Sequence, residues 1–169
     1  MMDRDILLAL YTYNAYANRL VLETVAGLTD DEFTRQSSPS HQSVRTLLVH
    51  MIGTEAFFLK LCQGQPLPTP PAAPPTLAEI QGYASQLPGE QESFLRSLDE
   101  ASLGREITFQ MGDQVLHLPV WQLLVQAFVH STHHRGELSI VLSHLGHPLP
   151  TLDIIIPFVT WSGQKWPWP

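Results

Sequence analysis

Apolar residues recur at steps of three and four positions along the beginning of the chain. In a helix of ~3.6 residues per turn this spacing gathers them on one face, so the pattern predicts a first helix from about Asp3 to Gly27. Asp3 or Asp5 can cap its start, and Gly27 is a suitable end. The apolar face consists of Ile6, Leu10, Tyr13, Ala17, Leu20 and Val21.

A second amphipathic helix is predicted from Ser43, a good N-capping residue, to about Cys62, and Gly64 follows its end. The stretch between the first two helices, Thr29 to Gln42, is polar, so we expect a connection with room for one short helical turn at Asp30 to Thr34. The apolar side of the second helix consists of Leu47, Leu48, Met51, Phe58 and Leu61.

Prolines crowd the segment from Gln65 to Pro75, which forbids a helix there and favours an extended polyproline II path. At ~3.1 Å per residue such a path is long enough to span a helix bundle. We interpret it as a crossover inside one domain, residues 1–169, because neither half of the chain looks able to build a core alone.

A third helix is predicted from about Leu77, because Thr76 and Glu79 match the capping box. We expect Pro88-Gly89 to break or kink this helix before it resumes to about Leu98.

The third part of the chain predicts extended structure followed by a long helix. Ile107–Phe109 and Val115–Leu118 flank a turn-like segment and favour a small β-hairpin or an extended loop. A fourth helix is predicted from Pro119, a favoured first helical residue, to Leu145, and Leu152–Trp161 predicts one last short helix. The expected fold is an all-α four-helix bundle with a long crossover between its second and third helices.

Charge and composition narrow the class of protein. The net charge of −7, a pI near 5.5 and scattered basic residues argue against nucleic-acid binding. The most apolar windows, Leu118–Val129 and Ile154–Val159, fall short of the ~20 residues that cross a bilayer, and Met1–Asp5 does not resemble a signal peptide. Cys62 is the only cysteine, which suits a reducing compartment, so we expect a cytoplasmic protein without membrane or nucleic-acid partners.

The chemistry of the fourth helix centres on two histidines. His130 and His134 lie one turn apart on one face, with Gln126 and Glu137 on the same face of an otherwise apolar helix. A buried polar group without a partner costs roughly 1–3 kcal/mol, and one metal ion can satisfy two imidazoles together. The alternative is a His-x-x-x-His pair that occurs by chance on a surface helix.

His50 is the candidate third ligand, because it lies among apolar residues of the second helix and two ligands rarely hold a metal tightly. Taken alone, a histidine in such a position is more often a core histidine bonded to a backbone carbonyl than a metal ligand. Glu137 is a candidate fourth ligand or a hydrogen-bond partner of a ligand. We expect no metal-binding role for the remaining histidines, His41, His117, His133, His144 and His147.

Four segments of the chain resemble motifs of the DinB/YfiT-like family of metal-dependent enzymes. They are Tyr13–Arg19, Ser43–His50, His130–Glu137 and Leu152–Ile155. The resemblance implies a four-helix bundle, usually dimeric, with a divalent metal ion, zinc or nickel, held by His50, His130 and His134. Glu137 stands where the family usually has Gln, and Phe57-Phe58 where it often has an aromatic pair containing Trp.

Some members of that family resemble thiol S-transferases that join a bacillithiol- or mycothiol-like small thiol to an electrophile, and this is the function we expect first. A metal-dependent hydrolase on the same site and a non-enzymatic metal- or ligand-binding bundle are the alternatives. Arg135 is either an anion contact for the thiol's carboxylates or a solvent-facing residue. The Trp-rich tail, Trp161–Pro169, either covers the core or a dimer seam or walls the substrate pocket.

Overall fold

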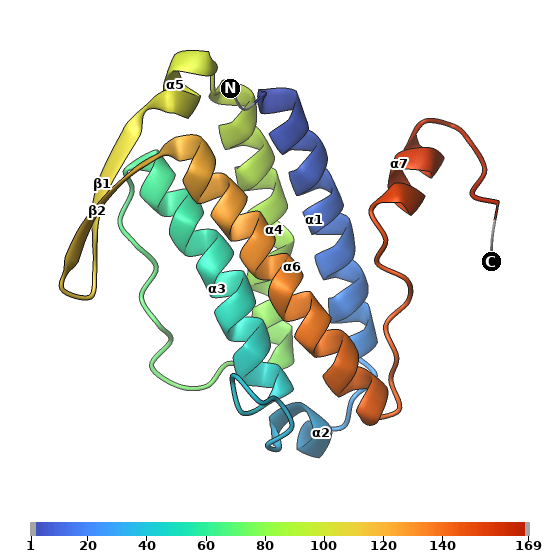
Figure 1. Cartoon of the computed structure of the whole chain (residues 1–169). Coiled ribbons are helices and arrows are strands. Elements are labelled where there is room, and N and C mark those ends of the chain that lie inside the picture. Colours follow the sequence, from blue (N-terminus) through green and yellow to red (C-terminus); the bar gives the residue numbers. More distant parts are fainter. Residues whose placement is uncertain (1–2, 168–169) are drawn as a thin grey trace.

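The computed structural model describes residues 3–167, which form seven helices and one two-stranded antiparallel sheet. Four helices are long: α1 (Arg4–Val25), α3 (Val44–Gln63), α4 (Leu77–Ser97) and α6 (Val120–His144). They lie side by side, with α1 packed on α4 and α6, and α3 packed on α4 and α6 (Figure 1). The predicted mostly helical class is therefore confirmed. Of the residues considered above, Met1, Met2, Trp168 and Pro169 lie outside the described part of the chain.

The helices begin where the capping residues predict. Asp3 caps α1 by accepting a hydrogen bond from the backbone N–H of Asp5 at 2.7 Å, and Ser43 caps α3 in a reciprocal pair with Thr46. Thr76 and Glu79 form the predicted capping box at the start of α4. Pro119 is the N-cap of α6 and not its first helical residue.

The break that was one expectation at Pro88-Gly89 is wrong, because α4 runs continuously from Leu77 to Ser97. Proline inside a helix costs ~3 kcal/mol, but Leu87 and Leu95 on either side of it are buried on the same face. Packing of that face on α1 and α3 outweighs the local preference. A short helix that we did not predict, α5 (Glu100–Gly104), follows, and Asp99 caps it by accepting from the Ser102 N–H at 2.8 Å.

The hairpin before α6 consists of β1 (Glu106–Met111) and β2 (Gln114–Pro119), which settles the choice between hairpin and loop. Ile107 pairs with Leu118 and Phe109 with Leu116, and the turn uses a φ of +62° at Gly112, which glycine adopts without strain. The other short elements are the helices α2 (Asp30–Thr34) and α7 (Ile155–Trp161), both close to their predicted bounds.

The proline-rich segment is the predicted crossover. Residues 65–75 contain no helix or strand, and in Figure 1 they run along the outside of α3 from its end back to the start of α4. As a result α3 and α4 point in the same direction, and α1 and α6 point the opposite way. Among the described residues, no helix has the length and apolar character needed to cross a bilayer.

The core consists of two apolar clusters with a polar layer between them. On α1, α4 and α6 the residues of one cluster precede the polar positions, and those of the other follow; on α1, for example, Leu7 and Tyr11 belong to one cluster and Val21 and Val25 to the other. On α3 the two clusters meet just beyond the polar position. The polar positions between the clusters are Asn14 and Asn18 on α1, Glu55 on α3, Gln91 on α4, and Ser131 and Arg135 on α6.

These polar side chains form hydrogen bonds with one another. Glu55, only 2% exposed, accepts hydrogen bonds from Asn18 Nδ2 at 2.8 Å, Ser131 Oγ at 2.6 Å and Gln91 Nε2 at 3.1 Å. Asn18 Oδ1 in turn accepts from Arg135 Nη1 at 2.7 Å, so one amide bridges the two buried charges. All four long helices are therefore joined by this one network.

Replacing Glu55 by alanine tests the network. The change leaves the donors of Asn18, Ser131 and Gln91 without an acceptor and Arg135 without its counter-charge, so we expect the free energy of unfolding to fall by about 3 kcal/mol or more. Glu23→Ala, which removes an exposed i,i+4 partner of Arg19, should change it by less than about 0.5 kcal/mol. Urea unfolding of both chelator-treated variants measures the difference, and equal small losses would show that the layer does not support the fold.

Candidate metal centre

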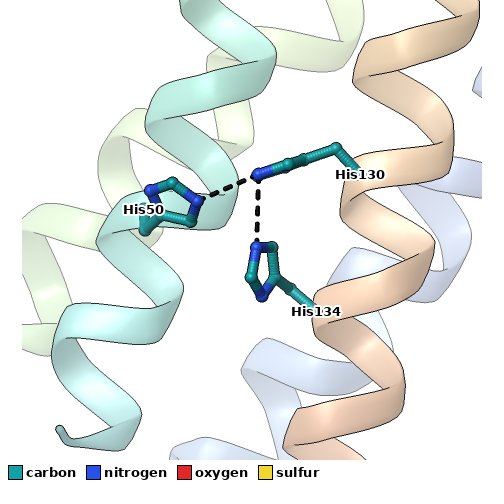
Figure 2. Close-up of side chains that lie close together, drawn as sticks. All are labelled: His50, His130 and His134. Carbon is teal, nitrogen blue, oxygen red and sulfur yellow. Dashed lines mark hydrogen bonds between the residues drawn. The ribbon is translucent and has the colours of Figure 1, made fainter. Parts of the chain in front are cut away.

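Three histidines from two adjacent helices converge at the level of the polar layer. His50 comes from α3, and His130 and His134 come from successive turns of α6, so the packing of α3 on α6 brings them together. His130 Nε2 lies 2.9 Å from His50 Nε2 and 3.2 Å from His134 Nε2 (Figure 2). One ligand atom from each residue falls within 4.8 Å of the others, a spacing that allows one metal ion.

The spacing of these nitrogens fits a tetrahedral site. Two nitrogens bound to one zinc ion, each at ~2.0–2.1 Å, lie about 3.3 Å apart. Without an ion, His130 Nε2 offers either one proton or one lone pair, which cannot serve both neighbouring nitrogens as a well-matched hydrogen bond. An ion among the three nitrogens would accept all three lone pairs. The donor set therefore fits a divalent metal ion that prefers imidazole ligands.

The electrostatics of the centre favour neutral imidazoles. Burial, together with the neighbouring histidines, lowers the pKa of His50 and of His130 to about 4, and burial lowers the pKa of His134 as well. A histidine binds metal through a neutral ring, so all three are in the ligating state at neutral pH.

Glu137 holds a loop and faces His134. Its carboxylate accepts hydrogen bonds from Ser38 Oγ and Ser40 Oγ, both at 2.5 Å, and its Oε2 lies 3.5 Å from His134 Nδ1. Although burial raises the pKa of Glu137, the hydrogen bonds from Ser38 and Ser40, together with the nearby His134, lower it to about 2. The residue therefore carries its negative charge on the side of His134 that faces away from the other two histidines. This position suits a hydrogen-bond partner of His134, one of the two roles considered for Glu137.

His41 is a member of the centre that we did not predict. Its ring stacks on that of His50, with the centroids 4.0 Å apart, and meets the His134 ring edge-on at 5.1 Å. With His134 and Glu137 it forms a second group whose spacing suits a metal ion. The only signal in the sequence was its position two residues before the N-cap Ser43, because a loop closed by backbone hydrogen bonds from Ser37 and Ser38 to Gln42 brings it back over α3.

Both expectations for Arg135, an anion contact or a solvent-facing residue, are wrong, because its side chain contacts no open site and does not face solvent. It is 2% exposed, donates to Asn14 Oδ1 at 2.6 Å, Asn18 Oδ1 at 2.7 Å and Thr132 Oγ1 at 2.9 Å, and lies over the Tyr13 ring. Arg135 therefore belongs to the polar layer between the two apolar clusters.

The remaining candidates are not among the three converging nitrogens, although the His133 ring meets that of His134 edge-on, with the centroids 5.0 Å apart. His117 bonds to Thr108 on the hairpin, and His147 lies 3.8 Å from Glu32. His133 and His144 are exposed on α6. Cys62 is buried, and burial raises the pKa of its thiol to about 12, which excludes it as a nucleophile at neutral pH.

Trp161, the first residue of the Trp-rich tail, lies against α1. The Trp161 ring packs edge-on against Tyr16 with the centroids 6.1 Å apart. It borders a cavity of about 650 Å³ between α1 and α4, which none of the three histidines lines. Trp161 therefore walls a pocket, but not one at the histidine centre.

The fold and the site together define a class of protein: a helical protein in which three histidines from neighbouring helices converge. The sequence matches the model of the DinB family over residues 1–160, so the chain belongs to the DinB family. Among solved structures it is similar to a DinB-like protein, YjoA, from Bacillus subtilis, with a TM-score of 0.64 and 19% identity over 85% of this chain and 96% of that one. This likeness shows the fold alone. No curated protein matches the sequence.

The lowered pKa values of His50 and His130 predict a pH dependence of stability in the metal-free protein. Between the ordinary pKa of 6.5 and the folded-state value of about 4, the unfolded chain binds more protons than the folded one. The free energy of unfolding should therefore fall as the pH drops through this window and should gain no slope from these groups above it. Urea unfolding of chelator-treated protein over this range measures the slope, which should be smaller in His50→Ala/His130→Ala. An unchanged slope in that variant would contradict the assignment.

Proposed function

We propose that this chain holds one divalent metal ion, zinc or nickel, with the Nε2 atoms of His50, His130 and His134. The observation that carries the proposal is the convergence of three neutral imidazole nitrogens at distances that suit one ion. The supporting frame is a single helical domain, residues 1–169, built as a four-helix bundle. Three protein ligands leave a position for a further ligand, as in catalytic sites.

The reaction we propose is transfer of a small bacillithiol-like thiol to an electrophile. The bound metal ion supplies the positive charge that favours a thiolate over a thiol, or, in the alternative of a metal-dependent hydrolase, a hydroxide over water. His50, His130 and His134 supply only neutral donors, so the ion's full charge stays available to the anion. Burial excludes Cys62 as a nucleophile and Arg135 as an anion contact. The nucleophile in this proposal is therefore the thiol of the co-substrate.

The groups around the ligands keep them in place. Glu137 faces His134 Nδ1 and at the same time holds the loop that carries His41. His41 covers a face of the His50 ring. These contacts support a preorganised site, which is what a ligand-binding or catalytic centre requires. A non-enzymatic metal- or ligand-binding bundle uses the same contacts and is the remaining alternative.

We also propose a homodimer in the cytoplasm. Val129 and Ile140 on α6 are 53% and 62% exposed and lie eleven residues apart, three helical turns on one face. Two exposed apolar side chains on one face of α6 suit contact with a second copy of the chain.

Metal content tests the proposed centre. The purified, tag-free protein should carry about one divalent ion per chain, and His130→Ala/His134→Ala should lose it. The matched control is His133→Ala/His144→Ala, which removes two exposed histidines from the same helix and should keep the ion. Elemental mass spectrometry measures all three. Equal, near-zero metal in every sample, persisting after zinc addition, would end the proposal.

Thiol-dependent consumption of an electrophile tests the proposed reaction. Monochlorobimane with bacillithiol should react faster with the metal-loaded protein than in buffer, and the gain should vanish in His130→Ala/His134→Ala. Turnover of activated esters without thiol would favour the hydrolase instead. A metal-loaded protein that accelerates neither reaction is a binding protein.

A further inference from the structure

A second feature of the structure adjoins the histidine centre. A half-open cavity of about 720 Å³ lies between α3, the proline-rich crossover and the first turns of α4, and its size falls in the range of ligand pockets, ~300–1,000 Å³. Successive turns of α3 contribute His50, Gly53 and Phe57 to its wall. The same His50 ring therefore borders the cavity and directs its Nε2 toward His130.

Gly53 keeps this cavity open. A Cβ placed at Gly53 would meet no other heavy atom within 4 Å, so no close packing requires a glycine at this position. Glycine inside a helix costs ~1 kcal/mol relative to alanine, and Gly53 lies in the middle of α3. The absence of a side chain there leaves the space between His50 and Phe57 free.

The other walls are rigid and apolar. The crossover contributes five prolines to the lining, whose rings fix the backbone and whose nitrogens carry no N–H, and α4 contributes Ile80 and Tyr83. The two charged residues at the cavity are already engaged. Lys60 Nζ lies 2.7 Å from Glu90, and Glu79 accepts the Thr76 N–H at 2.8 Å in the cap of α4. Because both charges already have partners, the cavity does not require a charged ligand.

We propose that this cavity binds a neutral, largely apolar molecule of about two aromatic rings, held between Phe57, Tyr83 and the prolines, with one end beside His50. The inference deepens the proposed function by assigning the apolar part of the electrophile to this cavity, and it rests on that function only for this assignment. Binding itself depends on the cavity alone, so it can be measured apart from metal content and turnover.

The test is binding of N-phenyl-1-naphthylamine, a neutral dye that fluoresces when it leaves water. The unmodified protein should bind it saturably. Gly53→Leu places a side chain in the cavity and should weaken binding about tenfold or more, which corresponds to about 1.4 kcal/mol. The matched control is Gly82→Leu, which adds the same bulk to α4 at an exposed site that lines no described cavity and also leaves 4 Å clear around its Cβ.

Further variants keep the outcome decisive. If Gly53→Leu lowers the melting temperature, Tyr83→Ala at a 45% exposed position serves instead, and it should weaken binding several-fold. No binding by the parent, or equal binding by the parent and Gly53→Leu (as expected if the dye entered the cavity beside Trp161), would overturn the proposal. Zinc content should stay the same in Gly53→Leu, so loss of dye binding with metal retained separates this inference from the metal proposal.

Discussion

The fold depends on two buried charges, Glu55 on α3 and Arg135 on α6, joined through the amide of Asn18 on α1. Neither charge can leave the core without exposing apolar neighbours, and neither can remain there without its partners. The hydrogen bonds therefore fix how far each helix is shifted along its axis. A slip of α6 by one turn, ~5.4 Å, would separate Ser131 from Glu55, and it would also separate His130 from His50. One alignment satisfies the layer and assembles the histidines.

This coupling explains why the centre lies where it does. Apolar side chains above and below the layer tolerate repacking, because contacts among leucines and valines have little directionality. Short hydrogen bonds do not tolerate such repacking, because they are directional. The polar layer therefore selects one alignment of the helices among those that bury a similar apolar area. His130 and His134 flank Ser131, which donates to Glu55 at 2.6 Å, and His50 precedes Glu55 by five residues on α3. The three histidines thus lie on the segments whose relative position is most constrained.

The features that the sequence predicted correctly are those that depend on residues close together in the chain. The period of α6 was enough to place His130 and His134 on one face, and the caps at Ser43 and Thr76 fixed two helix starts, since both depend on residues within one turn. The break expected at Pro88 failed because packing of α4 overrode a local preference. His41 was missed because its place over His50 depends on a loop closed by backbone hydrogen bonds, which leaves no periodic trace.

Arg135 shows the limit most clearly, because a charged residue in a helix gives no sign of whether it meets solvent or a buried partner 117 residues away. The same limit applies to His50. Its ring stacks on His41, directs Nε2 toward His130 on α6 and forms part of the cavity wall. Any molecule in that cavity that reaches His50 touches a residue that also faces the other two histidines. The cavity and the histidine centre therefore share the His50 side chain. A ligand in the cavity that moves this ring also changes its distance to His130, and a change in the centre that moves the ring alters the cavity wall.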